Sequence, residues 1–198
     1  MEVTPAMLQG AFPLLKVVLK RLGIRTARFK GRMEECGLVL RLCRFRDLPA
    51  VHSLCDPEIF LTASDAHVRA FGSLASLWSW MHETFQVFYL IELEEKIAHR
   101  IIGFVEIYKT ELGESLWVSL ALFDVKDRRR GYGQYALELL LTSLQEDRIV
   151  QRVYAEALAC NTGSLRLLEK LGFNVFAQEH GRLFLQKQLG CAMETGSP

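Results

Sequence analysis

A short basic turn, Arg128–Gly133, holds the residues of this chain best suited to bind a ligand. Three arginines precede a Gly-Tyr-Gly run, and an amphipathic stretch begins there. Glycines let a backbone approach a ligand closely and adopt positive φ angles. The first N–H groups of a helix lack intrahelical acceptors and attract anions, whereas arginines at that end oppose the helix dipole. The turn therefore predicts a phosphate or pyrophosphate site; the alternative is a solvated basic turn.

Two nucleotide-binding templates compete for this turn. The run Gly131–Ala136 fits the loose dinucleotide template G-x-G-x-x-A. That template belongs in a parallel βαβ unit, with an acidic residue about 20 residues further on. Here an antiparallel meander is predicted before the turn and a hairpin closes the chain, so a doubly wound sheet is not expected. A Walker loop is excluded, since no Gly-Lys-Ser/Thr sequence follows.

Two glutamates in apolar strands are candidates for proton transfer. Glu156 alternates with alanines in the predicted strand 152–158, and Glu106 lies within Gly103–Ile107. A carboxylate in such a strand needs a partner or a function; a structural ion pair or a partly exposed glutamate is the alternative. No histidine has metal-ligand spacing with a cysteine or a carboxylate, so no metal is expected. His180 is expected in an exposed turn.

The elements that must position these residues follow from hydrophobic spacing. Apolar alternation predicts strands over 38–44, 86–93, 101–109, 116–124 and 152–158, and a period near 3.6 predicts helices over 46–55, 64–82, 131–146 and 161–171. A hairpin is expected from 173–179 and 182–188, turning at His180-Gly181. Short polar connectors at 94–100 and 110–115 require antiparallel neighbours. The order predicts a single mixed α/β (α+β) domain with a mostly antiparallel sheet flanked by helices.

Composition limits the class of protein. Half of the 198 residues are apolar, 24% are charged and the formal net charge is +1, which excludes extended disorder. No stretch approaches the roughly 18 uncharged residues of a membrane span, so no membrane association is expected. Five cysteines, none in a C-x-x-C pair, predict neither a disulfide framework nor a zinc site. They favour a reducing, cytoplasmic location.

The N-terminal segment differs from the rest. Residues 1–36 are predicted to form a basic helical extension, because residues 1–33 carry seven basic side chains against one acidic and helical spacing runs over 4–24. Packing or an oligomer contact, an acidic partner for residues 16–32, and organelle targeting all remain open. A nucleic-acid or ribosome contact rests on the same charge run. Residues 37–188 form the predicted domain, and 189–198 a flexible tail.

Two motifs at this spacing resemble the GCN5-related N-acetyltransferases (GNAT). The motif R/Q-x-x-G-x-G/A is met by Arg128–Gly133. The motif N-x-x-S/A with a K-x-G-F close is met by Asn161, Ser164 and Lys170–Phe173. One helix and one strand lie between them, as in the family. The resemblance covers about residues 37–188.

The start of the predicted domain resembles one branch of this family. Leu38–Arg41, Asp47 and Asp56-Pro57 are similar to the opening of the ribosomal-protein serine/alanine acetyltransferases. The position of the base in histone-type relatives is Trp117 here, so that arrangement does not carry over.

The resemblance implies acetyl-CoA as cosubstrate, no metal, and a sheet whose central strands splay apart. In the family, the splayed strand pairs with the pantetheine arm, and the amides of the basic loop hold the pyrophosphate. The cofactor-binding residues so implied are Ala121, Leu122, Phe123, Arg128, Arg129, Arg130, Gly131, Tyr132, Gly133 and Asn161. Asn161 is also a candidate helix cap.

The resemblance also implies catalytic roles. Glu156 stands five residues before Asn161, where ribosomal-protein alanine acetyltransferases have a catalytic glutamate; Glu106 is the second candidate. Ser164 matches a polar position near the cofactor sulfur. Many relatives have a tyrosine seven residues after the asparagine, where this chain has Leu168. The acid is therefore Ser164, or no dedicated acid is needed.

These observations predict an acetyl-CoA-dependent N-acetyltransferase that acetylates a primary amine by direct attack. A protein N-terminus, a polyamine-like metabolite and an aminoglycoside remain open as acceptors. The alternative is a non-catalytic acyl-CoA-binding sensor or scaffold, favoured by Leu168 and Trp117. The aromatic residues Trp78, Trp80, Phe85 and Tyr89 are expected near the acceptor pocket or in the core.

Overall fold

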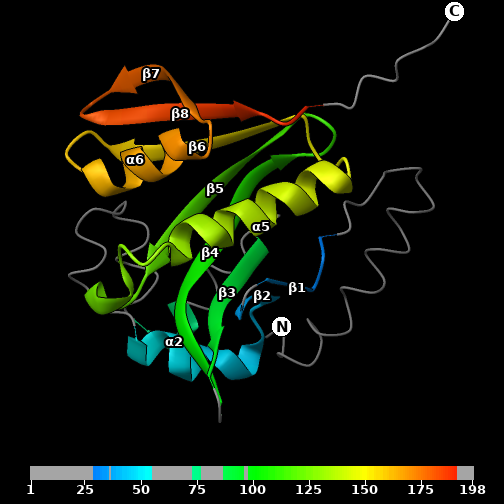
Figure 1. Ribbon diagram of the computed structural model, residues 1–198, viewed down its shortest axis with the longest axis vertical. Coiled ribbons are helices and arrows are strands. Elements are labelled where there is room, and N and C mark those ends of the chain that lie inside the picture. The colour runs from blue at the N-terminus through cyan, green and yellow to red at the C-terminus, as the bar shows by residue number, and fades with distance from the viewer. Residues whose placement is uncertain (1–28, 36, 55–72, 77–86, 96–97, 191–198) are drawn as a thin grey trace, which may run out of the picture.

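The computed structural model describes residues 29–35, 37–54, 73–76, 87–95 and 98–190 (Figure 1). Within these ranges the fold consists of eight strands and three α-helices, with two short 3-10 turns. The strands are β1 (Arg32–Glu35), β2 (Leu38–Leu42), β3 (Val87–Glu94), β4 (His99–Glu111), β5 (Ser115–Leu122), β6 (Arg152–Leu158), β7 (Asn174–Glu179) and β8 (Arg182–Gln188). The helical elements are η1 (Phe45–Asp47), α2 (Leu48–Leu54), η3 (Val125–Asp127), α5 (Tyr132–Glu146) and α6 (Thr162–Lys170).

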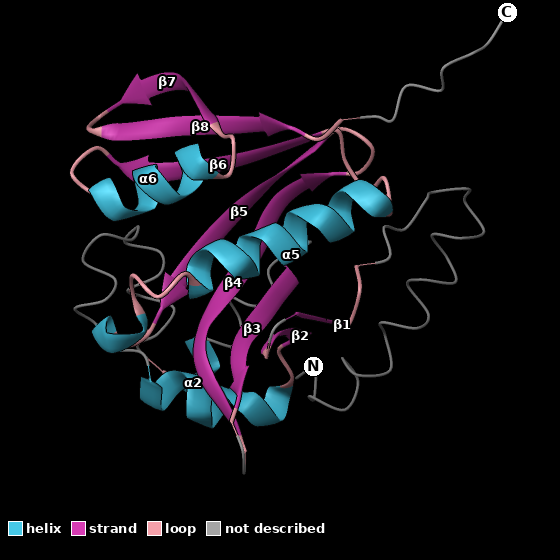
Figure 2. Ribbon diagram, viewed as in Figure 1, coloured by secondary structure: helices cyan, strands magenta, loops and turns pink. Residues whose placement is uncertain are grey.

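All eight strands form one sheet in the order β1-β2-β3-β4-β5-β6-β8-β7 (Figure 2). Every neighbouring pair is antiparallel except β5 and β6, which run parallel. The sequence prediction of a mixed, mostly antiparallel sheet is therefore confirmed. A single parallel pair excludes the doubly wound sheet that a dinucleotide fingerprint requires.

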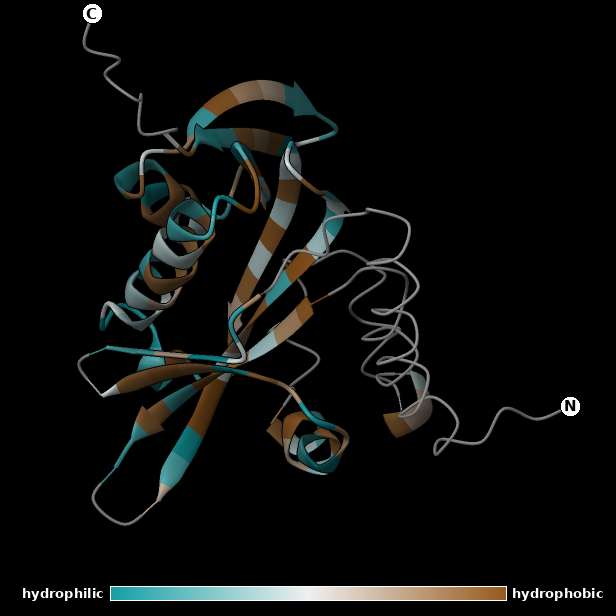
Figure 3. Cartoon of the chain, turned by 90° about the vertical axis from the view of Figure 1, so that its right-hand side faces the viewer, coloured by the Kyte–Doolittle hydropathy of each residue, from teal (hydrophilic) through white to brown (hydrophobic). Residues whose placement is uncertain are grey.

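Helix α5 covers one face of the sheet, and Figure 3 shows it on one side of the strands. The core between them buries Leu40, Tyr89, Val105, Ile107, Val118, Val153 and Leu185 of the sheet with Ala136, Leu137, Leu140 and Leu144 of α5. Helix α6 lies on the same face, since Leu168 and Leu171 join this core. Tyr89 is thus a core residue, and its hydroxyl donates to the Lys30 carbonyl at 2.7 Å.

Strand β1 lies in the segment for which the sequence predicted a helical extension. It pairs with β2 from Arg32–Arg41 to Glu35–Leu38. The ammonium group of Lys30 lies 2.8 Å from the Glu146 carboxylate at the end of α5. The last residues of the basic segment therefore belong to the sheet. The helix predicted over 4–24 lies outside the described residues, as does the charge run that precedes Phe29.

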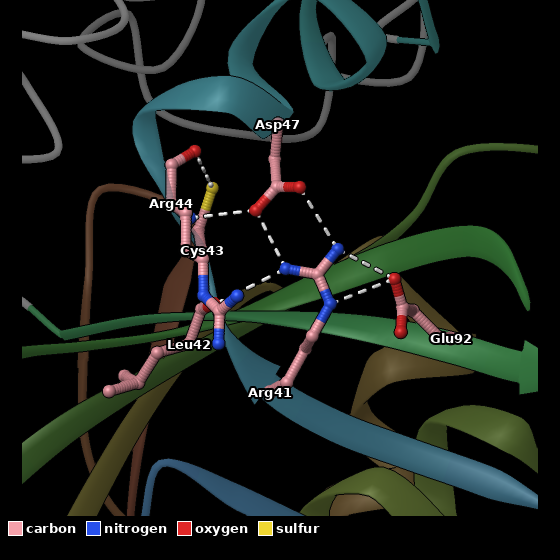
Figure 4. A network of polar contacts seen from close by, with 6 residues as sticks. All are labelled: Arg41, Leu42, Cys43, Arg44, Asp47 and Glu92. Atoms are coloured by element: carbon pink, nitrogen blue, oxygen red, sulfur yellow. Dashed lines mark hydrogen bonds and ion pairs between the residues drawn. The ribbon is translucent and has the colours of Figure 1, made fainter.

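A buried ion network joins β2, η1 and β3 (Figure 4). The Arg41 guanidinium donates to both Asp47 carboxylate oxygens, at 2.6 and 3.1 Å, and to Glu92 at 2.7 and 2.9 Å. Burial opposes ionisation of Asp47, but hydrogen bonds from Arg41 and the Arg44 N–H outweigh it and lower the pKa of Asp47. Asp47, part of the family-like opening, therefore fastens η1 to β2, and Arg41 in turn links β2 to β3.

The helix cap, the helix end and the hairpin turn predicted in the C-terminal half are confirmed. The Asn161 side chain caps α6 by accepting from the Ser164 N–H, and Gly172 follows the helix at φ 81°. His180 and Gly181, at φ 47° and 75°, form the tight turn of the β7–β8 hairpin, with His180 exposed. The helix predicted over 64–82 and the Asp56-Pro57 motif fall almost wholly outside the described residues, as do Trp78, Trp80 and Phe85.

Candidate active site

Strands β5 and β6 separate halfway along their length, which opens a V in the sheet (Figure 1). They pair in register from Ser115–Arg152 to Val118–Ala155 and no further. Beyond that point β5 still pairs with β4, and β6 still pairs with β8. The edges of Ser119–Leu122 and Glu156–Leu158 therefore face each other without a shared ladder. The splayed central strands predicted from the resemblance are present.

The edge of β5 beyond Val118 carries backbone groups that none of the eight described strands satisfies. The N–H of Phe123 donates to the Ile102 carbonyl at 2.9 Å, so Phe123 is turned toward β4. Because successive residues of a strand point their backbone groups to opposite sides, Leu122 and Leu120 are turned toward the V. The Leu122 carbonyl accepts a long hydrogen bond from Arg128 there, at 3.5 Å. Of the three strand positions expected to pair with a pantetheine arm, Leu122 turns its backbone toward the V, where its carbonyl accepts the bond from Arg128, and Ala121 and Phe123 face β4.

The N-terminus of α5 lies at the open side of the V (Figure 1). Its N-cap is Gly131 at φ 86°, and Arg129 two residues earlier has φ 59°. In the described part of the chain, the N–H groups from Arg129 to Gln134 donate to no acceptor, and the first bond of the helix is Tyr135 N–H to the Gly131 carbonyl. Six donors in one turn, beside three exposed arginines, are chemically suited to bind an anion.

Gly133 sets how closely α5 approaches the strand. A Cβ atom at this position would lie 3.3 Å from the Leu120 side chain and 3.7 Å from that of Leu167 on α6. The glycine therefore lets α5 rest on the end of β5 and beside α6. This contact keeps the start of the helix next to the free strand edge.

The loop that leads into α5 is fixed by a buried ion pair. The Asp127 carboxylate is 1% exposed and accepts from both terminal nitrogens of Arg100 on β4, at 2.7 and 2.9 Å. This hydrogen bonding raises the pKa of Arg100 further above its ordinary value. Arg100 also contacts Glu95 at 2.8 Å. The sequence did not indicate this pair, because its partners are 27 positions apart.

Asn161 and Ser164 lie at the other side of the V, where β6 ends and α6 begins. Asn161 is the helix cap, and the Ser164 hydroxyl makes no hydrogen bond within the described residues. Leu168, at the position where many relatives have a tyrosine, is 5% exposed and packed in the core. Ser164 is thus the hydroxyl that this helix presents near the predicted cofactor site.

Glu156 lies at the vertex of the V on the face opposite α5. Its carboxylate is 30% exposed and accepts from Arg182 of β8 at 3.2 Å. Glu106 shares that face, since it lies opposite Ser119 in the β4–β5 ladder, and it is 3% exposed. Burial raises the pKa of Tyr108 well above its ordinary value, and the carboxylates of Glu156 and Glu106 act in the same direction. The two predicted bases therefore lie on one face, whereas Ser164 approaches from the other.

Glu156 is surrounded by a cluster of aromatic rings. This cluster was not identified from the sequence. We call it the aromatic face; it consists of Tyr108, Trp117, Tyr154, Phe176 and Phe184, one residue from each of five strands. Part of the aromatic face could have been predicted from the sequence, because Trp117 and Tyr154 alternate with buried apolar residues and so lie on the opposite face of their strands. Their meeting required the register of β5 against β6.

Membrane-spanning helices and metal-binding clusters were both sought among the described residues. No helix in the described residues is long and apolar enough to cross a membrane. Likewise, no three His, Cys, Asp or Glu side chains within the described ranges are grouped so as to hold a metal ion.

Comparison with known proteins assigns the family. The family model described as "Acetyltransferase (GNAT) domain" matches residues 37–174. The chain therefore belongs to the GNAT acetyltransferase family. A search among curated proteins found no match.

Solved structures share the fold at low sequence identity. A ribosomal-protein α-N-acetyltransferase (RimL) in complex with coenzyme A superimposes with a TM-score of 0.68 at 14% identity, over 80% of this chain and 98% of that one. A spermidine N-acetyltransferase from Vibrio cholerae with CoA and spermine gives 0.64 at 16% identity, over 78% and 97%. A ribosomal-protein-alanine N-acetyltransferase from Brucella melitensis gives 0.58 at 21% identity, over 76% and 99%.

Proposed function

We propose that this chain is an acetyl-CoA-dependent N-acetyltransferase in which a primary amine attacks the thioester directly. The observation that carries the proposal is the V between β5 and β6, with the unsatisfied N–H groups of α5 at its open side. Those groups and Arg128–Arg130 would bind the pyrophosphate of CoA. The free edge at Leu120 and Leu122 would pair with the amides of the pantetheine arm, as an added strand does. The cofactor supplies an activated acetyl group.

Glu156 is the proposed general base. An ammonium group has no lone pair, so a base must accept a proton before the amine can attack. Glu156 lies at the vertex of the V, on the face that α5 leaves uncovered, and Arg182 orients its carboxylate from 3.2 Å. Glu106 is the second candidate, but its side chain is 3% exposed. The partly exposed carboxylate of Glu156 is the better placed to exchange a proton with an incoming amine or a bridging water.

Backbone and hydroxyl donors on the other side complete the proposed site. The thioester oxygen gains negative charge during attack, and the N–H of Leu120, which has no ladder partner on β6, would donate to it. Ser164 lies in the first turn of α6, which covers the face opposite Glu156, and would protonate the departing thiolate. Base and acid from opposite faces fit a reaction in which the amine enters on one side and the thiol leaves on the other.

The test is thiol release from acetyl-CoA in the presence of a panel of primary amines. We expect release with at least one amine, and expect Glu156→Gln to lower kcat about 100-fold or more while the Kd for CoA stays within about twofold. Glu106→Gln is the matched variant and should change kcat far less. Tight CoA binding without release for any amine would instead support the sensor or scaffold. An equal loss of turnover and CoA affinity in Glu156→Gln would assign Glu156 a structural role.

The proposal includes a cytoplasmic setting. Cys43 and Cys160 are free thiols, as expected of a protein in a reducing compartment.

A further inference from the structure

The aromatic face is partly open beside the proposed base. Trp117 stacks on Tyr154 with ring centroids 5.1 Å apart, and Phe184 meets Trp117 edge-on at 6.1 Å. Phe176 of the edge strand β7 lies 5.5 Å from Tyr154 and is 47% exposed. Phe184 is directly opposite Glu156 in the β6–β8 ladder. An amine that reaches Glu156 therefore brings its neighbouring group against aromatic rings.

Positive charges border these rings. The Lys109 ammonium group lies over Trp117, 5.0 Å from the ring centroid, and the Arg152 guanidinium lies over Tyr154 at 5.9 Å. Arg182 pairs with Glu156. Among the described residues, the carboxylates on this face include Glu156, already paired with Arg182, and the buried Glu106. Two more lie toward its margins, Glu179 opposite Arg182 in the β7–β8 ladder and Glu111 opposite Ser115 in the β4–β5 ladder. Cationic side chains of the protein itself therefore occupy the positions beside these rings. A second positive charge on the acceptor would be repelled there, so such acceptors are disfavoured.

On this basis we propose that the aromatic face selects an acceptor whose primary amine is its single positive charge and lies next to an apolar, preferably aromatic, group. The inference rests on the proposed function and narrows its acceptor. Two sources share this chemistry, namely the α-amino group of a peptide that begins with an aromatic residue and a free arylalkylamine. A polyamine, in contrast, would place its further ammonium groups near Lys109 and Arg152.

The acceptor panel for the experiment separates these sources. It contains a peptide with an N-terminal phenylalanine, the same peptide with an N-terminal alanine, phenethylamine, and spermidine, each with acetyl-CoA and a thiol-release readout. We expect a higher kcat/KM for the phenylalanine peptide or for phenethylamine than for both other acceptors. The better of the two identifies the source. Higher kcat/KM for spermidine or for the alanine peptide would overturn the inference while leaving the acetyltransferase intact, whereas no turnover with any amine would count against the proposed function.

Variants link the preference to these rings. Phe176→Ala removes an exposed ring, so the fold should tolerate it, and should raise the KM for the aromatic acceptor about 2- to 12-fold with kcat and the Kd for CoA unchanged. Leu112→Ala is the matched control, because Leu112 is 42% exposed but lies in the β4–β5 turn. Lys109→Gln should raise kcat/KM for spermidine about threefold relative to the parent, since it removes a nearby like charge. An unchanged KM in Phe176→Ala, or an equal change in Leu112→Ala, would refute the role of the aromatic face.

Discussion

Asp127→Asn should destabilise the fold and weaken CoA binding together. The carboxylate is 1% exposed and makes two charge-assisted bonds to Arg100. Asparagine loses the charge and turns one amide donor toward a guanidinium. Breaking a buried pair costs about 3–5 kcal/mol. Because Arg100 is 35% exposed and can be solvated, we expect a smaller loss, about 2–3 kcal/mol of unfolding free energy.

Thermal unfolding and CoA titration measure the two effects. A loss of that size should lower the Tm by about 5–10 °C in a chain of this length. The Kd for CoA should rise about tenfold if about 1.4 kcal/mol is required to restore the loop on binding. Asp124→Asn is the control: Asp124 caps η3 by accepting from the Lys126 N–H, and asparagine caps equally well. A double-mutant cycle with Arg100→Met should give a coupling energy of about 1–3 kcal/mol.

Two results would contradict this reasoning. A Tm within about 1 °C of the parent would mean that the ion pair adds nothing measurable to the fold. A lowered Tm with an unchanged Kd for CoA would mean that the pair stabilises the sheet but does not position the loop that leads into α5.

Three further predictions concern other parts of the chain. Gly131→Ala should weaken CoA binding, because φ at this position is 86° and the new Cβ would lie 3.2 Å from the Tyr135 ring. The control is Gly113→Ala, at φ 83° with nothing within 4 Å, which should cost about the same 1–2 kcal/mol of stability and leave the Kd for CoA unchanged. Equal CoA affinity in the two variants would refute this prediction. Asp47 has a lowered pKa in the folded state, so its stabilisation is complete above the unfolded pKa of about 3.9 and lost as the pH falls through the folded value. The difference in unfolding free energy between the parent and Asp47→Asn should therefore be largest near neutral pH and shrink below about pH 4, and a pH-independent difference would contradict the argument. Burial raises the pKa of the Cys43 thiol to about 12, so iodoacetamide followed by peptide mapping should modify exposed Cys160 well before Cys43; equal rates would show that Cys43 is accessible.

The sequence by itself determined the features that depend on a few neighbouring residues. The cap at Asn161, the left-handed Gly172 and the His180-Gly181 turn were predicted correctly, because each follows from the backbone preferences of one or two residues. The turn at Arg128–Gly133, which we propose binds phosphate, is equally local in the sequence. Its donors come from one helix end, and a contiguous motif describes them completely.

Strand β1 was not predicted from the sequence. Its sequence, Arg-Met-Glu-Glu, has one apolar residue among three charged ones, so it carries no clear strand alternation. It forms a strand because β2 offers a free edge and a backbone ladder makes few demands on side chains.

The arrangement around the proposed base was decided by tertiary structure alone. Whether Trp117 meets Tyr154 depends on the register of β5 against β6, and a shift of one residue would send every side chain to the other face. The same register determines where the strands part, and so which carboxylate stands at the vertex. Alternation shows which residues share a face of one strand, but the register between strands is set by packing summed over the whole sheet.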